Sequence, residues 1–207
     1  MGKRSASKSI GSRTFRLNDY PCRGEQLRAP LGRCRGGTAT GNIVRYEWTF
    51  IDGNVGAGAA VERIYAEPGE YSEILKVTNS TGDVDYDFAI VQVIDKAAPA
   101  LLPPTIHAAF APTMNIHAGD AVTFKVRSFR TTAGEETWDF GDGSEKVTVK
   151  SDGNVNSLAR DGYAVTQHRF ARAGQYLVRV ERTNERGERA IAHLYVPVAT
   201  AAAIATE

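Results

Sequence analysis

The same short aromatic strand and turn occur twice in this chain, and their tryptophans are 90 residues apart. The first copy reads Trp48-Thr-Phe50-Ile-Asp52-Gly53 and the second reads Trp138-Asp139-Phe140-Gly141-Asp142-Gly143. Trp and Phe two positions apart point to the same face of a strand. The Asp-Gly that follows supplies a tight turn, because glycine tolerates a positive φ. The repeat therefore predicts two related β-domains.

A second paired signal follows each aromatic strand in the same order. Gly69-Glu-Tyr71 and Gly174-Gln-Tyr176 each open a strand, and a Gly-containing turn leads each into a closing strand, at residues 86–94 and 189–198. Gly-x-Tyr at this point is typical of a tyrosine corner, and no segment sustains a helical period. We therefore expect an all-β chain of two tandem immunoglobulin-like β-sandwiches with seven strands each. The aromatic residues expected in their cores are Trp48, Phe50, Trp138 and Phe140.

Proline-rich composition marks the boundary between the two halves. Pro99, Pro103 and Pro104 cannot donate to a regular strand ladder, so this stretch is expected to be a semi-rigid linker. The predicted order is a basic arm at 1–13, a first domain at 14–95, a linker at 96–104, a second domain at 105–198 and an alanine-rich tail at 199–207. The second half also carries an insertion at 145–162, expected to be an extra hairpin or a projecting loop.

Charge is unevenly distributed along the chain. Residues 1–48 hold ten Lys/Arg against three acids, and residues 49–207 hold fifteen against twenty-one. The basic part is either a solvated arm with an arginine-rich edge or a surface that attracts polyanions. It lacks interleaved aromatic residues, so no nucleic-acid partner is expected. No apolar run approaches the roughly 20 residues needed to cross a bilayer, and the N-terminal stretch is not a signal peptide.

The two cysteines, Cys22 and Cys34, are separated by eleven residues, which matches no zinc or redox motif. One interpretation is a disulfide that closes a short loop in an exported protein. The other is a pair of free thiols.

The second half resembles the polycystic kidney disease (PKD) domain family over residues 105–198. The family signature combines Trp-Asp-Phe-Gly-Asp-Gly, His-x-Phe, Gly-x-Tyr and alternating valines. These stand here as Trp138 to Gly143, His168, Phe170, Gly174, Tyr176, Val178 and Val180. The first half resembles the family more weakly over 14–95. It departs from the signature at Thr49, at Ile51, and at Ile64-Tyr65 in place of His-x-Phe.

No converged catalytic set is visible in the sequence, so no enzyme is predicted. The four histidines have no metal-binding spacing, and no serine lies in a Gly-x-Ser-x-Gly elbow. His168 is expected to cap a turn. The resemblance implies a candidate calcium site at Asp139 and Asp142, because some PKD-type domains of secreted collagenases bind calcium near this turn. The alternative is that both carboxylates only accept hydrogen bonds from turn N–H groups.

The resemblance also implies a function. It is a non-catalytic accessory or spacer module of a larger exported or cell-surface protein, which positions neighbouring domains or contacts a protein or polysaccharide. The alternative is a dedicated carbohydrate-binding module attached to a polysaccharide-degrading enzyme. That role requires exposed, coplanar aromatic residues, and the tyrosines without another role are Tyr20, Tyr86, Tyr163 and Tyr195. Apart from the candidate calcium, no cofactor is expected.

Overall fold

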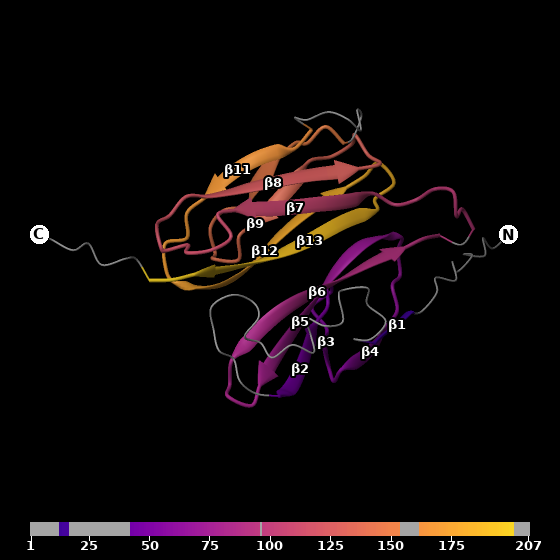
Figure 1. Cartoon of the computed structure of the whole chain (residues 1–207). Coiled ribbons are helices and arrows are strands. Elements are labelled where there is room, and N and C mark those ends of the chain that lie inside the picture. The colour runs from indigo at the N-terminus through magenta and orange to yellow at the C-terminus, as the bar shows by residue number, and fades with distance from the viewer. Residues whose placement is uncertain (1–12, 17–41, 96, 154–161, 201–207) are drawn as a thin grey trace, which may run out of the picture. The chain divides into compact units, whose positions relative to one another are not determined.

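The computed structural model describes residues 13–16, 42–95, 97–153 and 162–200, and its regular structure is all β-strand (Figure 1). The chain divides into two compact units, Met1–Pro68 with Glu73–Leu102 and Gly69–Ser72 with Pro103–Glu207. The prediction of tandem immunoglobulin-like β-sandwiches in an all-β chain is confirmed. None of the described residues lies in a helix long and apolar enough to span a membrane.

The first unit has six strands among its described residues. β2 pairs with β3 and β5, and β6 pairs with β5, so these four strands have the order β6-β5-β2-β3, while β1 pairs with β4. The strands are β1 (Arg13–Arg16), β2 (Ile43–Thr49), β3 (Val55–Ala57), β4 (Ala60–Arg63), β5 (Gly69–Asn79) and β6 (Val84–Val93). The seventh strand and the disulfide between Cys22 and Cys34 stay predictions, because residues 17–41 lie outside the described residues.

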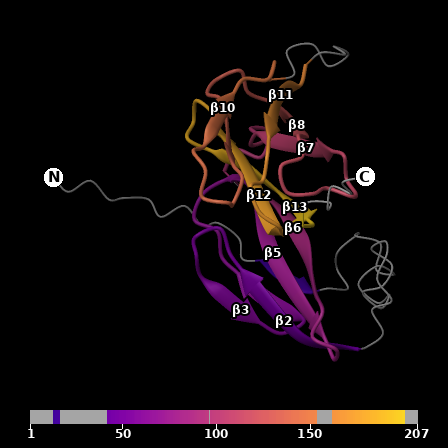
Figure 2. The ribbon, with the colours of Figure 1, turned by 90° about the vertical axis from the view of Figure 1, so that its left-hand side faces the viewer.

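The second unit has the seven strands that the sequence predicts. One sheet has the order β10-β9-β12-β13 and the other β11-β8-β7, and the long strands β12 and β13 run antiparallel over their whole length (Figure 2). The strands are β7 (Thr105–Ala111), β8 (Val122–Phe129), β9 (Glu136–Asp139), β10 (Val147–Val149), β11 (Ala164–His168), β12 (Gly174–Thr183) and β13 (Arg189–Val198). β10 lies inside the predicted insertion at 145–162 and forms a hairpin with β9, which precedes the insertion. Residues 154–161 of the insertion lie outside the described residues.

Aromatic rings fill the core of the second unit. The ring of Phe124 on β8 lies 5.3 Å from that of Trp138 and 5.1 Å from that of Phe140. All three side chains are buried, as are the inward valines of β8 and β12. Burying a tryptophan removes about 150–250 Å² from water. At about 25 cal/mol per Å² this contributes roughly 4–6 kcal/mol as an upper bound. The predicted burial of Trp138 and Phe140 is confirmed.

The first unit has a smaller core of the same kind. Trp48 and Phe50 are buried with Leu75 and Val77 of β5, as predicted. The Trp48 indole also donates a hydrogen bond to the carbonyl of Gly58, 3.0 Å away. Its polar edge is therefore satisfied while its ring is removed from water.

The tyrosine corner predicted at Tyr176 is present. The Tyr176 hydroxyl donates to the carbonyl of Arg172 at 2.8 Å, four residues upstream. A Cβ at Gly174 would lie 3.2 Å from this ring, which explains why glycine opens the strand. Tyr71 is buried, and its ring lies 3.3 Å from the position of a Cβ added at Gly69.

Candidate functional site

The signature turn of the second unit uses both of its carboxylates in local hydrogen bonds. Asp139 Oδ1 accepts from the backbone N–H of Gly141 at 3.0 Å, and its Oδ2 lies 3.2 Å from the Lys146 ammonium. Asp142 Oδ1 accepts from the backbone N–H and the hydroxyl of Ser144, at 3.1 and 2.6 Å. Carboxylates that bind backbone N–H groups two positions ahead stabilise turns. Bonding to turn N–H groups, one of the two predicted alternatives, is thus present at both residues.

His168 connects this turn to the end of β11. Its Nε2 lies 2.7 Å from Asp142 Oδ2, and its ring stacks on Phe140 with centroids 3.9 Å apart and planes 4° apart. The same ring meets the edge of Phe170 at 4.7 Å. The prediction that His168 caps a turn is confirmed, since one side chain contacts the turn acid and two core aromatic rings.

Arg63 takes the equivalent position in the first unit. Its Nη2 lies 2.5 Å from Asp52 Oδ2, and its guanidinium carbon lies 4.6 Å from the centre of the Phe50 ring and 5.7 Å from that of Tyr65. Arg63, Asp52, Phe50 and Tyr65 thus repeat the contacts of His168, Asp142, Phe140 and Phe170. Arg63 was not predicted from the sequence, because only Ile64-Tyr65 was set against the family's His-x-Phe. The structure shows that Arg63 stands where the family has its histidine.

Local contacts lower the pKa of both signature carboxyls in the second unit below the ordinary 3.8. Partial burial raises the pKa of Asp139, but the Gly141 N–H and the Lys146 ammonium lower it by more. Partial burial likewise raises the pKa of Asp142, and hydrogen bonds from Ser144 and His168 outweigh it. Both groups are therefore ionised at neutral pH.

The geometry bears on whether these acids could hold calcium. Calcium takes six to eight oxygen ligands, chiefly carboxylates and carbonyls. All four carboxylate oxygens of Asp139 and Asp142 already lie beside a protein donor, and one of these donors is the cationic Lys146. Within the described ranges, no group of three or more His, Cys, Asp or Glu side chains is arranged to hold a metal ion. The calcium site stays a prediction.

A buried polar network in the second unit was not anticipated from the sequence. Glu136 Oε1 accepts from Arg182 Nη1 at 2.7 Å, from the Ser128 hydroxyl at 2.7 Å and from the Ser151 hydroxyl at 2.5 Å. Its Oε2 accepts from the backbone N–H of Ser151 at 2.8 Å. The side chains of Glu136 and Arg182 are both fully buried. Arg182 continues the alternation of Val178 and Val180 along β12. Because residues two apart in a strand point to the same face, this spacing could have predicted that Arg182 points inward.

The network also holds residues 151 and 152 of the inserted segment 145–162. Ser151, which bonds Glu136, is followed by Asp152, which accepts from Arg127 Nε and Nη2 at 2.9 and 2.7 Å. Burial raises the pKa of Glu136, but hydrogen bonds from Ser151, Ser128 and Arg182 lower it to below its ordinary 4.5. The carboxylate is therefore charged at neutral pH, and its charge is balanced inside the core.

The described tyrosines without another predicted role belong to different segments of the chain. Tyr86 is on β6 of the first unit, Tyr163 precedes β11 and Tyr195 is on β13, and all three are half-buried. The Tyr163 hydroxyl lies 2.9 Å from His107 Nδ1. Tyr20 lies outside the described residues.

Solved structures with a related arrangement have low similarity to this chain. They include fibronectin(III)-like modules of CbhA from Clostridium thermocellum, at 13% identity and a TM-score of 0.36, covering 83% of this chain and 86% of that one. Dimeric latent PorU from Porphyromonas gingivalis matches at 13% identity and 0.36, covering 80% of this chain and 17% of that one. A chimeric titin Z1Z2 tandem matches at 17% and 0.28, covering 78% and 92%. At these TM-scores the likenesses support no argument about this chain.

Family models give a clear result. Residues 32–93 match a model described as PKD domain, and residues 107–196 match a second model with the same description. The two matches together span more than half of the chain, and each contains one copy of the aromatic turn described above. The chain therefore belongs to the PKD domain family and contains two PKD domains in tandem.

Proposed function

We propose that this pair of PKD domains is a non-catalytic accessory module of a larger exported or cell-surface protein, where it positions neighbouring domains or contacts a protein or polysaccharide. Membership of the PKD family, whose domains generally occur as non-catalytic modules of extracellular or surface proteins, supports this proposal. The partners that it implies are the other domains of that protein.

One observation carries the proposal: the two units build the same contact with different residue types. His168 meets Asp142, Phe140 and Phe170, whereas Arg63 meets Asp52, Phe50 and Tyr65. Imidazole can accept and donate protons near neutral pH, but guanidinium stays protonated. A position that accepts either residue serves packing and charge pairing, rather than proton transfer.

Other polar residues of the second unit also serve the fold. Asp139 and Asp142 hold the turn, and Glu136 and Arg182 neutralise each other inside the core. Catalysis requires a nucleophile or base that points at a substrate position. These four side chains are instead directed at groups of their own domain, which favours a structural role for each.

The experiment exchanges the two residue types. His168→Arg should change the melting temperature of the second domain little, and Arg63→His should change that of the first domain little. His168→Ala should lower the melting temperature of the second domain. In parallel, the full chain is incubated with chromogenic esters, glycosides, phosphate esters and peptides, and no turnover above buffer is expected. Turnover that His168→Arg abolishes while the domain stays folded would overturn the non-catalytic assignment.

A further inference from the structure

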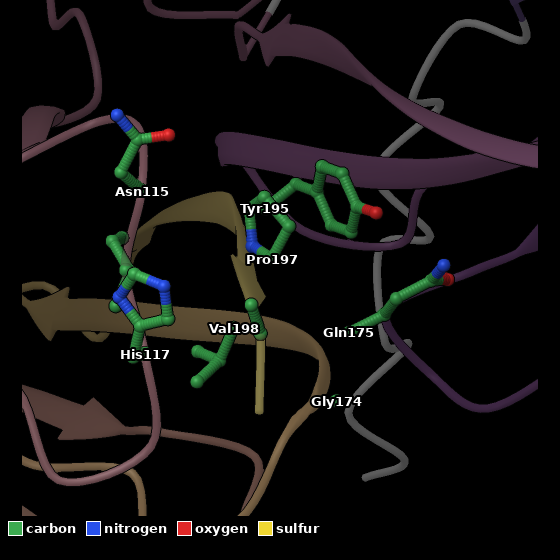
Figure 3. Close-up of a pocket in the computed structure, with 9 residues that line it drawn as sticks. Asn115, His117, Gly174, Gln175, Tyr195, Pro197 and Val198 are labelled. Atoms are coloured by element: carbon green, nitrogen blue, oxygen red, sulfur yellow. The ribbon is translucent and has the colours of Figure 1, made fainter. Parts of the chain in front are cut away.

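The second unit has a surface hollow whose lining residues take no part in the signature turn or in the buried Glu136–Arg182 network. It has a volume of about 480 Å³ and lies where the segment between β7 and β8 meets the start of β12 and the end of β13 (Figure 3). Small-molecule sites in proteins range over roughly 300–1,000 Å³. Its size therefore suits a small ligand or one or two units of a polymer.

The walls of the hollow combine one aromatic ring with neutral polar groups. Tyr195 and Pro197 present ring faces, and Asn115, His117 and Gln175 carry amide or imidazole groups around them (Figure 3). The side-chain amides of Asn115 and Gln175 have no hydrogen-bond partner among the residues that the structure describes, and both side chains are exposed. These amides can therefore both donate to and accept from a ligand.

Asn115 also has an unusual backbone. Its φ is 54°, and Arg130 is the other non-glycine residue with positive φ among the described residues. Asparagine tolerates this conformation better than most residues, at some cost in free energy. This backbone conformation sets the direction of the Asn115 Cα–Cβ bond at the rim of the hollow.

Charge limits the class of ligand. None of the nine lining residues is Asp, Glu, Lys or Arg. A site for phosphates or carboxylates requires cations, and a metal site requires carboxylates. His117 Nδ1 lies 3.4 Å from Asp120 Oδ2, and an imidazole nitrogen can donate or accept a hydrogen bond according to its tautomer. The lining thus offers neutral donors and acceptors beside an aromatic face.

Part of the backbone around the hollow is already paired. Ala199 donates to Ile116 and accepts from Ala118, at 2.8 and 2.9 Å, and Gly174 is in register with Val198 in the β12–β13 ladder. A peptide that binds by adding a strand needs unpaired backbone groups at a sheet edge. The backbone groups of Ile116, Ala118 and Ala199 that make these bonds are therefore not free to pair with an added strand.

We propose that this hollow binds a neutral saccharide, with the C–H face of a pyranose ring against Tyr195 and its hydroxyl groups bonded to Asn115, Gln175 and His117. A sugar ring has an apolar face and a rim of neutral hydroxyls, which matches the two kinds of wall. The inference rests on the proposed function, because it makes the second domain a binding module and names its ligand class.

The test titrates the full chain with cellohexaose, xylohexaose, mannohexaose and chitohexaose, followed by two-dimensional amide NMR. We expect at least one oligosaccharide to shift the side-chain amide signals of Asn115 and Gln175, with a Kd of about 1 mM. Tyr195→Ala should weaken this binding about 10-fold, and Gln175→Ala, at an exposed side chain, about 3-fold. Tyr163→Ala is the matched control, a half-buried tyrosine that precedes β11 and does not line the hollow, and it should leave the Kd unchanged.

The proposal is overturned if none of the four sugars shifts these amides at about ten times the expected Kd. It is equally overturned if Tyr195→Ala and Gln175→Ala bind as wild type does, or if a decaproline peptide binds the hollow while the sugars do not. Sugar titrations without any chemical-shift change would not contradict the proposed non-catalytic function. Cleavage of an oligosaccharide during the titration, seen in the same spectra, would instead contradict the proposed function.

Discussion

Removing the positive partner of the buried Glu136–Arg182 pair should strongly destabilise the second domain. Arg182→Met keeps much of the side-chain volume but leaves the Glu136 carboxylate buried without its counter-charge. Two serine hydroxyls and the backbone N–H of Ser151 still donate to this carboxylate, so it loses its charge partner but not all its hydrogen bonds.

The expected cost follows from that change. Removing one partner of a buried ion pair costs about 3–5 kcal/mol. In the wild type, Arg182 Nη2 is itself buried without a partner among the described residues, which places the cost towards the lower end. Glu136→Leu combined with Arg182→Met should cost at least 2 kcal/mol less than the sum of the two single changes, on the order of measured couplings.

The assay is urea unfolding at pH 7, where Glu136 is ionised, followed by NMR through the two indole N–H signals. Trp138 reports on the second domain and Trp48 on the first. With a slope of about 2 kcal/mol per molar urea, the Trp138 midpoint should fall by roughly 1.5–2 M while the Trp48 midpoint stays put. A loss below about 1 kcal/mol, typical of an exposed pair, would refute the reasoning.

Four further outcomes are expected. Trp138→Ala should cost the second domain about 3–5 kcal/mol and leave the Trp48 transition in place; a common shift of both transitions would contradict independent cores. Burial lowers the pKa of His193 to about 4 from an ordinary 6.5, so the unfolded state takes up a proton first as the pH falls, and the second domain should lose about 3 kcal/mol between pH 6.5 and 4. His193→Asn should flatten that dependence in acid-titrated urea melts, and an unchanged slope would count against it. Millimolar calcium should raise the melting temperature of the second domain, and Asp142→Ala should abolish the rise, if the predicted calcium site forms; an unchanged wild-type melt would remove the site. The predicted Cys22–Cys34 disulfide requires a thiol count of zero in the unfolded, unreduced chain, and a count of two would exclude it.

Local patterns in the sequence were sufficient for the fold class and for the residues of the signature turn. Trp138 and Phe140 alternate with polar residues at the strand period, and this period alone places both rings on one face. Asp142 lies two residues before the N–H that it bonds, and Tyr176 lies four residues after the carbonyl that it bonds. Interactions of such short range are visible in the order of residues.

Contacts between distant segments depended on the tertiary structure. Arg182 and Glu136 are 46 residues apart and meet because β12 pairs with β9 in a register that sets Val180 opposite Trp138. Arg63 in the first domain occupies the position that His168 has in the second. In each domain the fold places this side chain over a phenylalanine ring, Phe50 or Phe140. The sequence by itself determined which residues prefer the inside of a strand, since that preference is local. Only the tertiary structure decided which buried charges pair and which surface residues surround a hollow, because strand register joins segments whose separation along the chain carries no such information.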